Sequence, residues 1–286
     1  MRFGGMLFGP WDSPEQWARA AVDAGYGGVY FPVDSTAKTC VIDGYAQAAE
    51  AYGLVISEIG VWNNPMHPDR SKRQAAFERA VRQLELADYV GANCCVNISG
   101  SLNPEVWDGP HPENFSRRAF DEAVEITRRI IDAVKPVRTF YVLEPMPFMY
   151  PDSADSYLEM IRAVDRDAFG AHIDIVNILS SPRAYYDNTR VINEWFDKLG
   201  SYIKSCHAKD SRLSDELTVH LDECRPGTGN LDYDTYLRRV SRLPDRVCLM
   251  LEHLSGREEY EMAAGFIRSR ACALGIRLNG EESKRA

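Results

Sequence analysis

The sequence lacks an apolar run long enough to cross a membrane, since none approaches the roughly 18 residues that a spanning helix needs. Its first residues, MRFGGMLFGPW, do not combine a charged start with a long apolar core, so no signal peptide is expected there. The seven cysteines are odd in number and have no CxxC spacing. Because Cys94, Cys95 and Cys248 lie inside apolar runs, we expect buried free thiols and a reduced, cytoplasmic protein.

The chain also lacks an excess of positive charge. It has 33 Lys and Arg against 42 Asp and Glu, which gives a net charge of −9. A surface that binds nucleic acid normally needs a basic footprint. We therefore expect neither a nucleic-acid nor a membrane partner, and the oligomeric state stays open between a monomer, a homo-oligomer and a complex with a partner subunit.

What the chain does contain is an alternation of short apolar runs with longer amphipathic segments. The apolar runs predict eight strands, at 3–8, 27–33, 54–61, 93–99, 139–145, 170–176, 202–208 and 247–253. The amphipathic segments predict eight helices, at 13–25, 42–53, 69–83, 114–136, 153–167, 188–200, 231–243 and 257–275. The first helix should be capped by Ser13 and begin at Pro14.

Strands that alternate with helices indicate a parallel sheet, and eight such units fit a (β/α)₈ TIM barrel. An open doubly wound sheet is the alternative, but no Gly-x-Gly-x-x-Gly follows the first run. We predict a single domain over residues 1–280 and a mobile tail over 281–286. Two long connections, 97–116 and 208–234, should lie at the carboxyl end of the barrel as candidate lids.

Potential metal ligands occur at the ends of the last four apolar runs. They are Glu144, Asp174, His207 and Glu252. Because the ends of neighbouring parallel strands converge, one ligand per strand predicts a shared site at the mouth of the barrel. Three carboxylates and one imidazole suit a hard divalent cation, with Mn²⁺ favoured and Mg²⁺ or Co²⁺ as alternatives, better than a structural zinc site.

Strand alternation predicts which neighbours share the face of the ligands. His172 shares a face with Asp174, and Lys209 shares one with His207. Asn177 and Arg212 follow these strands, and both of them, together with His172 and Lys209, are predicted to contact substrate. His253 should point outward and pack against the helices.

Aromatic residues and one histidine follow other strands and are further candidates for substrate contact. They are Trp11, Trp62, His67 and Trp107. Aromatic rings stack on the faces of carbohydrates, but they also contribute much of the apolar area at the rim of a barrel. So many aromatic residues favour a substrate that is larger or less polar than a free pentose.

Five short segments together resemble the xylose isomerase-like superfamily of sugar isomerases and epimerases, in their order and spacing. They are LEP at 143–145, HIDIVN at 172–177, HAKD at 207–210, GTGNLDY at 227–233 and LEH at 251–253. The resemblance implies that Glu144, Asp174, His207 and Glu252 bind a metal ion. It also implies, by similarity to ketose 3-epimerases, that Glu144 and Glu252 form the acid/base pair.

The chain departs from the epimerase pattern at two positions. Asn177 stands where those enzymes usually have histidine, and Leu213 where they usually have an arginine that contacts substrate, with Arg212 one residue earlier. An amide carries no charge and shuttles no proton, so the same carboxylates could instead serve a lyase, such as a dehydratase of keto-inositols or an enzyme that cleaves 3-keto-glycosides, including C-glycosides.

The leading prediction is a divalent-metal-dependent isomerase or epimerase of a sugar, keto-sugar or cyclitol, and the lyase is the alternative. A multi-zinc apurinic endonuclease would need more than the six histidines present and a basic groove. A sugar-binding barrel without chemistry would be expected to have lost part of the ligand set, and all four residues are present.

Overall fold

Each of the eight apolar runs overlaps a strand in the computed structural model, which describes residues 1–278, and β1 and β6 begin one residue before their predicted runs. The strands are β1 (Arg2–Gly4), β2 (Gly28–Tyr30), β3 (Val55–Gly60), β4 (Cys94–Asn97), β5 (Phe140–Leu143), β6 (Phe169–Ile173), β7 (Ile203–Ala208) and β10 (Cys248–Leu251). They pair in the closed order β1-β10-β7-β6-β5-β4-β3-β2, and every neighbouring pair is parallel. The predicted single (β/α)₈ barrel is confirmed. The predicted boundary at residue 280 and the tail 281–286 lie outside the described residues.

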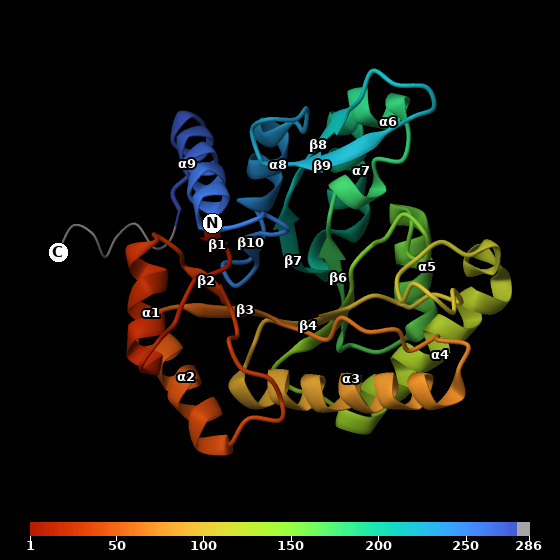
Figure 1. Cartoon of the computed structure of the whole chain (residues 1–286), viewed down its shortest axis with the longest axis horizontal. Coiled ribbons are helices and arrows are strands. Elements are labelled where there is room, and N and C mark those ends of the chain that lie inside the picture. Colours follow the sequence, from red (N-terminus) through yellow and green to blue (C-terminus); the bar gives the residue numbers. More distant parts are fainter. Residues whose placement is uncertain (279–286) are drawn as a thin grey trace.

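The helices surround the strands on the outside of the barrel (Figure 1). The long ones are α1 (Pro14–Asp23), α2 (Thr39–Ala51), α3 (Arg70–Val90), α4 (Arg117–Val134), α5 (Ala154–Val164), α7 (Asn188–Leu199), α8 (Tyr233–Val240) and α9 (Arg257–Ala273). Shorter turns of helix were not predicted, and these are η1 (Pro112–Phe115), η2 (Val176–Ile178), α6 (Pro182–Tyr186) and η3 (Gly200–Tyr202).

The start of α1 follows from its sequence. The Ser13 side chain accepts a hydrogen bond from the backbone N–H of Gln16, and Pro14 occupies the first helical position, as predicted. The prediction for α2 began too late, because that helix starts at Thr39 rather than at Ile42. Thr39 and Cys40 have no apolar periodicity of their own, and the Lys38 side chain makes no capping hydrogen bond that would mark the start.

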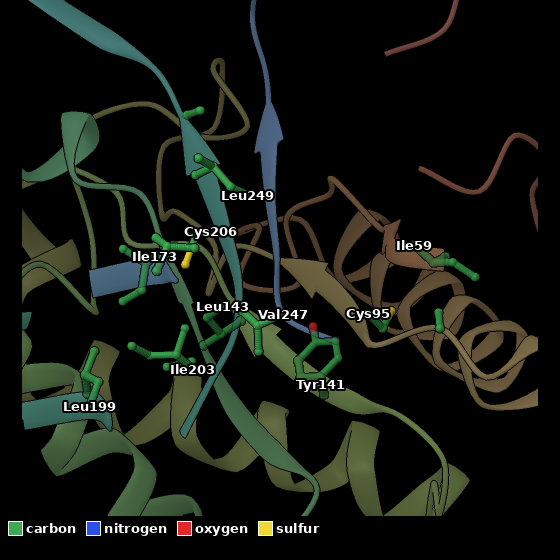
Figure 2. Packing of buried hydrophobic residues seen from close by; sticks show 14 of the residues in the cluster. Ile59, Cys95, Tyr141, Leu143, Ile173, Leu199, Ile203, Cys206, Val247 and Leu249 are labelled. Carbon is green, nitrogen blue, oxygen red and sulfur yellow. The ribbon is translucent and has the colours of Figure 1, made fainter. Parts of the chain in front are cut away.

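The packing of the strands decides which residues face the barrel interior. Leu143, Ile173 and Cys206 precede three of the candidate ligands and belong to the main buried apolar cluster, where Figure 2 shows them on neighbouring strands. Alternation along a strand then directs the next residue to the opposite face, which is the inside of the barrel. All seven cysteines are free, and Cys94, Cys95, Cys206 and Cys248 are buried, as expected from the apolar runs.

The connection after β7 contains a hairpin that was not predicted. Its strands β8 (Asp210–Leu213) and β9 (Leu221–Cys224) are antiparallel and form a separate sheet, which extends from the barrel in Figure 1. The Asp210 carboxylate anchors the far end of this connection, because it accepts backbone hydrogen bonds from Gly227 at 3.0 Å and Gly229 at 3.1 Å. Over residues 1–278, no helix combines the length and the apolar character needed to span a bilayer.

Candidate metal centre

The four candidate ligands meet at the carboxyl end of the barrel. Glu144 directly follows β5, Asp174 follows β6, His207 lies in β7 and Glu252 follows β10. One ligand atom from each lies within 4.8 Å of the others. Asp174 is 0 %, His207 1 % and Glu144 4 % exposed, and the Glu252 side chain is 15 % exposed. The site is therefore a buried cluster that opens to solvent on the Glu252 side.

The His207 imidazole stands between the carboxylates. Its Nδ1 lies 2.9 Å from Glu252 Oε2 and 3.3 Å from Glu144 Oε1, while its Nε2 lies 3.2 Å from Glu58 Oε2. Burial opposes a charge on this ring, but the Glu252 and Glu58 carboxylates outweigh it and raise the pKa of His207 well above its usual value. Burial likewise opposes the charge of Glu252, yet His207 prevails and lowers the pKa of that carboxyl to about 2.

A buried lysine supplies the second positive charge of the cluster. Lys209 Nζ lies 2.8 Å from Asp174 Oδ2, 3.0 Å from Glu252 Oε2 and 3.5 Å from Glu144 Oε1, and the residue is 1 % exposed. It shares the face of His207, as alternation predicts. The ammonium thus sits against the same carboxylate oxygens that a divalent cation would use.

The donor set fits a hard divalent ion. Three carboxylates and one imidazole converge, and the buried oxygens Asp174 Oδ2 and Glu252 Oε2 contact the Lys209 ammonium at 2.8 Å and 3.0 Å as ion pairs, without the alignment of a hydrogen bond. Carboxylate oxygens together with an imidazole nitrogen are donors that suit Mn²⁺, Mg²⁺ or Co²⁺.

Asn177 contacts the cluster from the turn η2. Its side-chain Nδ2 donates to Glu144 Oε1 at 3.0 Å, and its Oδ1 accepts from Lys209 Nζ at 3.4 Å. The amide therefore links Glu144 to Lys209 and restrains both. It stands at the edge of the site, where it also lines the cavity above the ligands.

A cavity of about 620 Å³ opens above the cluster. Charged and polar groups of the lining include Glu58, Glu144, Asn177 and Glu252 at the cluster, and also Asp34, Arg79, Gln83, Asp108 and His253. The rest of the lining is largely apolar and aromatic, and it includes Met6, Phe31, Val33, Ile59, Trp62, Ile98, Trp107, Leu254 and Tyr260. The site can hold a small polar group at the ligands together with a larger apolar group beside it.

The Trp62 indole is held over the cluster by its backbone. Trp62 adopts a left-handed conformation with φ 47°, and its ring centroid lies 6.5 Å from that of His207. A side chain on Gly60 would collide with this indole, so glycine is needed there. Asn97 fixes the segment that follows, since its side chain accepts from the Asn63 backbone N–H at 3.1 Å and donates to the Asn63 side chain at 3.0 Å.

The remaining residues that were predicted to contact substrate do not all lie at the site. Trp107 lines the cavity, whereas Trp11 packs on the main apolar cluster. His67 is buried near the start of α3, where its Nδ1 accepts from the Asp69 backbone N–H. Arg212 is exposed on β8 and donates to the Thr228 carbonyl at 3.2 Å. His172 is fully buried, and its ring centroid lies 4.0 Å from that of His207.

The prediction for His253 was wrong. Its side chain is 57 % exposed at the cavity mouth rather than packed against helices, and its Nδ1 lies 3.2 Å from Glu223 Oε2. The strand alternation used for the prediction ends at Leu251, and His253 has a left-handed backbone with φ 56°. The turn therefore redirects the side chain toward the hairpin.

Sequence reasoning also missed Glu58, which lies inside β3 and contacts His207 from across the barrel. The predicted ligands all stand at strand ends, whereas Glu58 stands between Ser57 and Ile59 within an apolar run. One signal was available, because a carboxylate is rarely found inside a buried strand without a partner.

Comparison with known proteins identifies one matching family. The sequence model of the xylose isomerase-like TIM barrel family matches residues 18–270. No curated protein matches the chain by sequence.

Several solved structures share the fold. A xylose isomerase-like TIM barrel protein from Mycobacterium smegmatis in complex with magnesium is 18 % identical, with a TM-score of 0.68 and 96 % of each chain covered. A probable 3-DHS dehydratase of petrobactin synthesis from Bacillus anthracis is 15 % identical, with a TM-score of 0.69 and coverage of 94 % of this chain and 98 % of that one. D-psicose 3-epimerase from Clostridium cellulolyticum with D-tagatose is 12 % identical, with a TM-score of 0.65 and coverage of 96 % and 98 %. At these identities the likeness shows the fold alone.

Proposed function

The chain belongs to the xylose isomerase-like TIM barrel family, and we propose that it is a divalent-metal-dependent isomerase or epimerase of a sugar, keto-sugar or cyclitol. The observation that carries this proposal is the convergence of Glu144, Asp174, His207 and Glu252 within 4.8 Å, below a cavity of about 620 Å³. Solved structures with the same fold include an epimerase and a probable dehydratase, which supports an enzymatic role.

Strand order gives the two glutamates distinct positions. The ligands come from four adjacent strands, and Glu144 on β5 and Glu252 on β10 are the outer two, with Asp174 and His207 between them. A substrate group above the cluster would have one glutamate on each side. Two carboxylates so placed can remove a proton from carbon and return it at another face or at a neighbouring carbon.

An ion bound by the four residues would supply Lewis-acid stabilisation of the oxyanion that forms when carbon beside a carbonyl loses its proton. Asp174 and His207 would hold it in place, and Glu144 and Glu252 would bind it and exchange the substrate proton. Lys209, now against Asp174, would turn its ammonium toward a substrate oxygen. Trp62 would exclude water and pack on the substrate face.

A lyase that proceeds through the same enolate is the second candidate, and Asn177 favours it. Its amide donates to Glu144 Oε1 but can neither accept charge nor relay a proton. With less control over proton return, the enolate could instead expel a leaving group. The apolar side of the cavity offers room for such a group, for example the aglycone of a 3-keto-glycoside.

The test is proton exchange in D₂O with enzyme that has been stripped by chelation and reloaded with Mn²⁺. Ketoses, 3-keto-glycosides and keto-inositols are supplied in turn, and mass spectrometry follows deuterium in the substrate and any eliminated product. Deuterium in a rearranged sugar supports the isomerase or epimerase, and an eliminated product supports the lyase. If metal-loaded enzyme exchanges no proton in any of them, the proposal fails.

Two substitutions test the roles of the carboxylates. Glu144→Gln and Glu252→Gln should each abolish turnover, because each removes one member of the proton-transfer pair. The matched control is Glu216→Gln, which changes an exposed carboxylate in the turn between β8 and β9. Intact turnover in both glutamate variants would exclude the two-carboxylate mechanism.

A further inference from the structure

We propose that Glu58 is a positioning residue, which holds the His207 imidazole so that its Nδ1 faces the ion. This inference rests on the proposed metal site, since it assigns a function to a group behind one of the ligands. Glu58 lies in β3, which is on the opposite side of the closed strand order from β7. It is 1 % exposed.

The contacts around Glu58 form a small polar layer below the ligands. Its Oε2 lies 3.2 Å from His207 Nε2, and its Oε1 accepts a hydrogen bond from the Ser205 hydroxyl. His172 Nε2 lies 3.7 Å from the same Oε1, which is beyond hydrogen-bond distance. Ser205 and His172 are two residues before His207 and Asp174 on their strands, so they lie one layer deeper inside the barrel.

The two ring nitrogens of His207 have different surroundings. Nδ1 lies 2.9 Å from Glu252 Oε2 among the ligand carboxylates, so it is the nitrogen that would bind the ion. The proton of the neutral ring must then sit on Nε2, where Glu58 can accept it. An ionised carboxylate can only accept hydrogen bonds, so Glu58 selects the tautomer with its proton on Nε2, and the bond orients the ring.

Glu58, His172 and His207 could alternatively hold a second ion, because their ligand atoms also lie close together and both nitrogens of His172 lack a hydrogen-bond partner. Two ions would require His207 to bind one at each nitrogen, and therefore to lose both ring protons. A single hydrogen bond to Glu58 leaves the imidazole neutral. The geometry thus favours positioning, and the number of ions bound distinguishes the two.

The experiment compares Glu58→Gln with the wild type and with Asp210→Asn. Glu58→Gln keeps the size of the side chain but removes its charge and one acceptor oxygen. Asp210→Asn is the matched control, since it alters a carboxylate that is equally buried but faces the backbone of Gly227 and Gly229. Mn²⁺ affinity and stoichiometry are measured by EPR titration, and the Nε2 proton of His207 is observed by NMR of ¹⁵N-histidine-labelled protein with Mg²⁺.

We expect Glu58→Gln to weaken Mn²⁺ binding by about 10- to 100-fold and to shift the Nε2–H resonance, as removal of such a partner typically does. Asp210→Asn should stay within about twofold of wild type on the same scale. Glu58→Asp, which keeps the charge, should regain part of the loss. Circular dichroism checks that each variant folds. If Glu58→Gln does not fold, Ser205→Ala tests the same polar layer and should weaken Mn²⁺ binding about 3-fold.

Three results would overturn the proposal. The first is an unchanged Mn²⁺ affinity and an unchanged Nε2–H resonance in Glu58→Gln, or in Ser205→Ala if that variant replaces it. The second is an equal loss of Mn²⁺ affinity in Asp210→Asn. The third is a wild type that binds two ions and a Glu58→Gln variant that binds only one. A wild type that binds no divalent ion would instead defeat the proposed function. The Nε2–H resonance of the metal-free protein would still report whether Glu58 holds His207.

Discussion

The two sides of the cavity differ in the kind of residue that the barrel supplies. The strands β5, β6, β7 and β10 contribute three carboxylates, His207 and Lys209, whereas the connections after β1, β2, β3 and β4 contribute mostly apolar and aromatic side chains. Both sides share the same architecture of parallel strand and crossover helix. The difference therefore lies in the residues placed at the strand ends.

This division separates two tasks. Charged groups at short distances serve proton transfer and ion binding, and their cost of burial is offset only because they compensate one another. Apolar groups recognise whatever extends from the reacting carbons, and contribute in proportion to the area they cover. If the division is real, substitutions on the first side should change turnover and ion binding, and those on the second should change substrate preference.

Among the substitutions that test this division, Asp174→Asn should have the largest effect. Asp174 is fully buried, and the asparagine would leave the ion with one fewer anionic ligand. Turnover should fall by about 1000-fold or more, as several kcal/mol of charge stabilisation are lost. Steady-state kinetics with saturating Mn²⁺ measures this. Asp222→Asn on the exposed hairpin is the control, and a similar loss there would contradict a specific role for Asp174.

Lys209→Met should destabilise the metal-free protein more than the metal-loaded one. Without the ammonium, Asp174 and Glu252 lose a partner at 2.8 Å and 3.0 Å, and breaking a buried pair costs about 3–5 kcal/mol. A bound divalent ion would replace that charge. Thermal unfolding with Mn²⁺ and with EDTA tests this, and an equal loss in both conditions would show that the ion and the ammonium do not share the carboxylates.

Trp62→Ala tests the apolar side. The indole lies over the cluster, so its removal should raise KM by about tenfold for a keto-glycoside with an aromatic aglycone and leave kcat nearly unchanged. A small ketose should respond less. Tyr186→Ala provides an exposed aromatic control outside the cavity. A fall in kcat with constant KM would place Trp62 on the chemical side of the comparison instead.

The smallest effect is expected from Asp34, which pairs with Arg79 on the apolar side at 2.8 Å. Hydrogen bonds from the Thr36 backbone and hydroxyl, together with Arg79, lower the pKa of Asp34 to about 2. Because the pKa is lowered on folding, the pair stabilises above about pH 4 and loses its contribution as the pH falls toward 2.

Both side chains are more than one third exposed, so solvent screening keeps the contribution small. Asp34→Asn should cost less than about 1 kcal/mol at pH 7. Urea unfolding at pH 7, 4 and 3 follows the difference, which should shrink with falling pH. If the difference in unfolding free energy between wild type and Asp34→Asn instead grew as the pH fell, the predicted direction of the pH dependence would be wrong.

Much of the fold and of the metal site could be predicted because the signals are local. Glu144, Asp174 and Glu252 each follow an apolar strand directly, and period-two alternation turns them to the face opposite Leu143, Ile173 and Leu251. Closure of the barrel then brings neighbouring strand ends together without further information.

What could not be predicted depends on contacts between distant strands and on turns. Glu58 gains its role only because β3 lies across the barrel from β7. Arg212 was expected at the substrate, but alternation along β7 does not continue into β8, whose partner is β9. His253 was redirected by one left-handed residue, a conformation that no local pattern of polar and apolar residues indicates.

The contact between Glu58 and His207 spans 149 positions of sequence. Loop-closure entropy makes contacts of this separation late events in folding. A partly folded chain in which only the last four strands had paired would lack the Glu58 contact that orients the His207 imidazole. Tight ion uptake should therefore report barrel closure, and a refolding experiment could use bound Mn²⁺ as its probe.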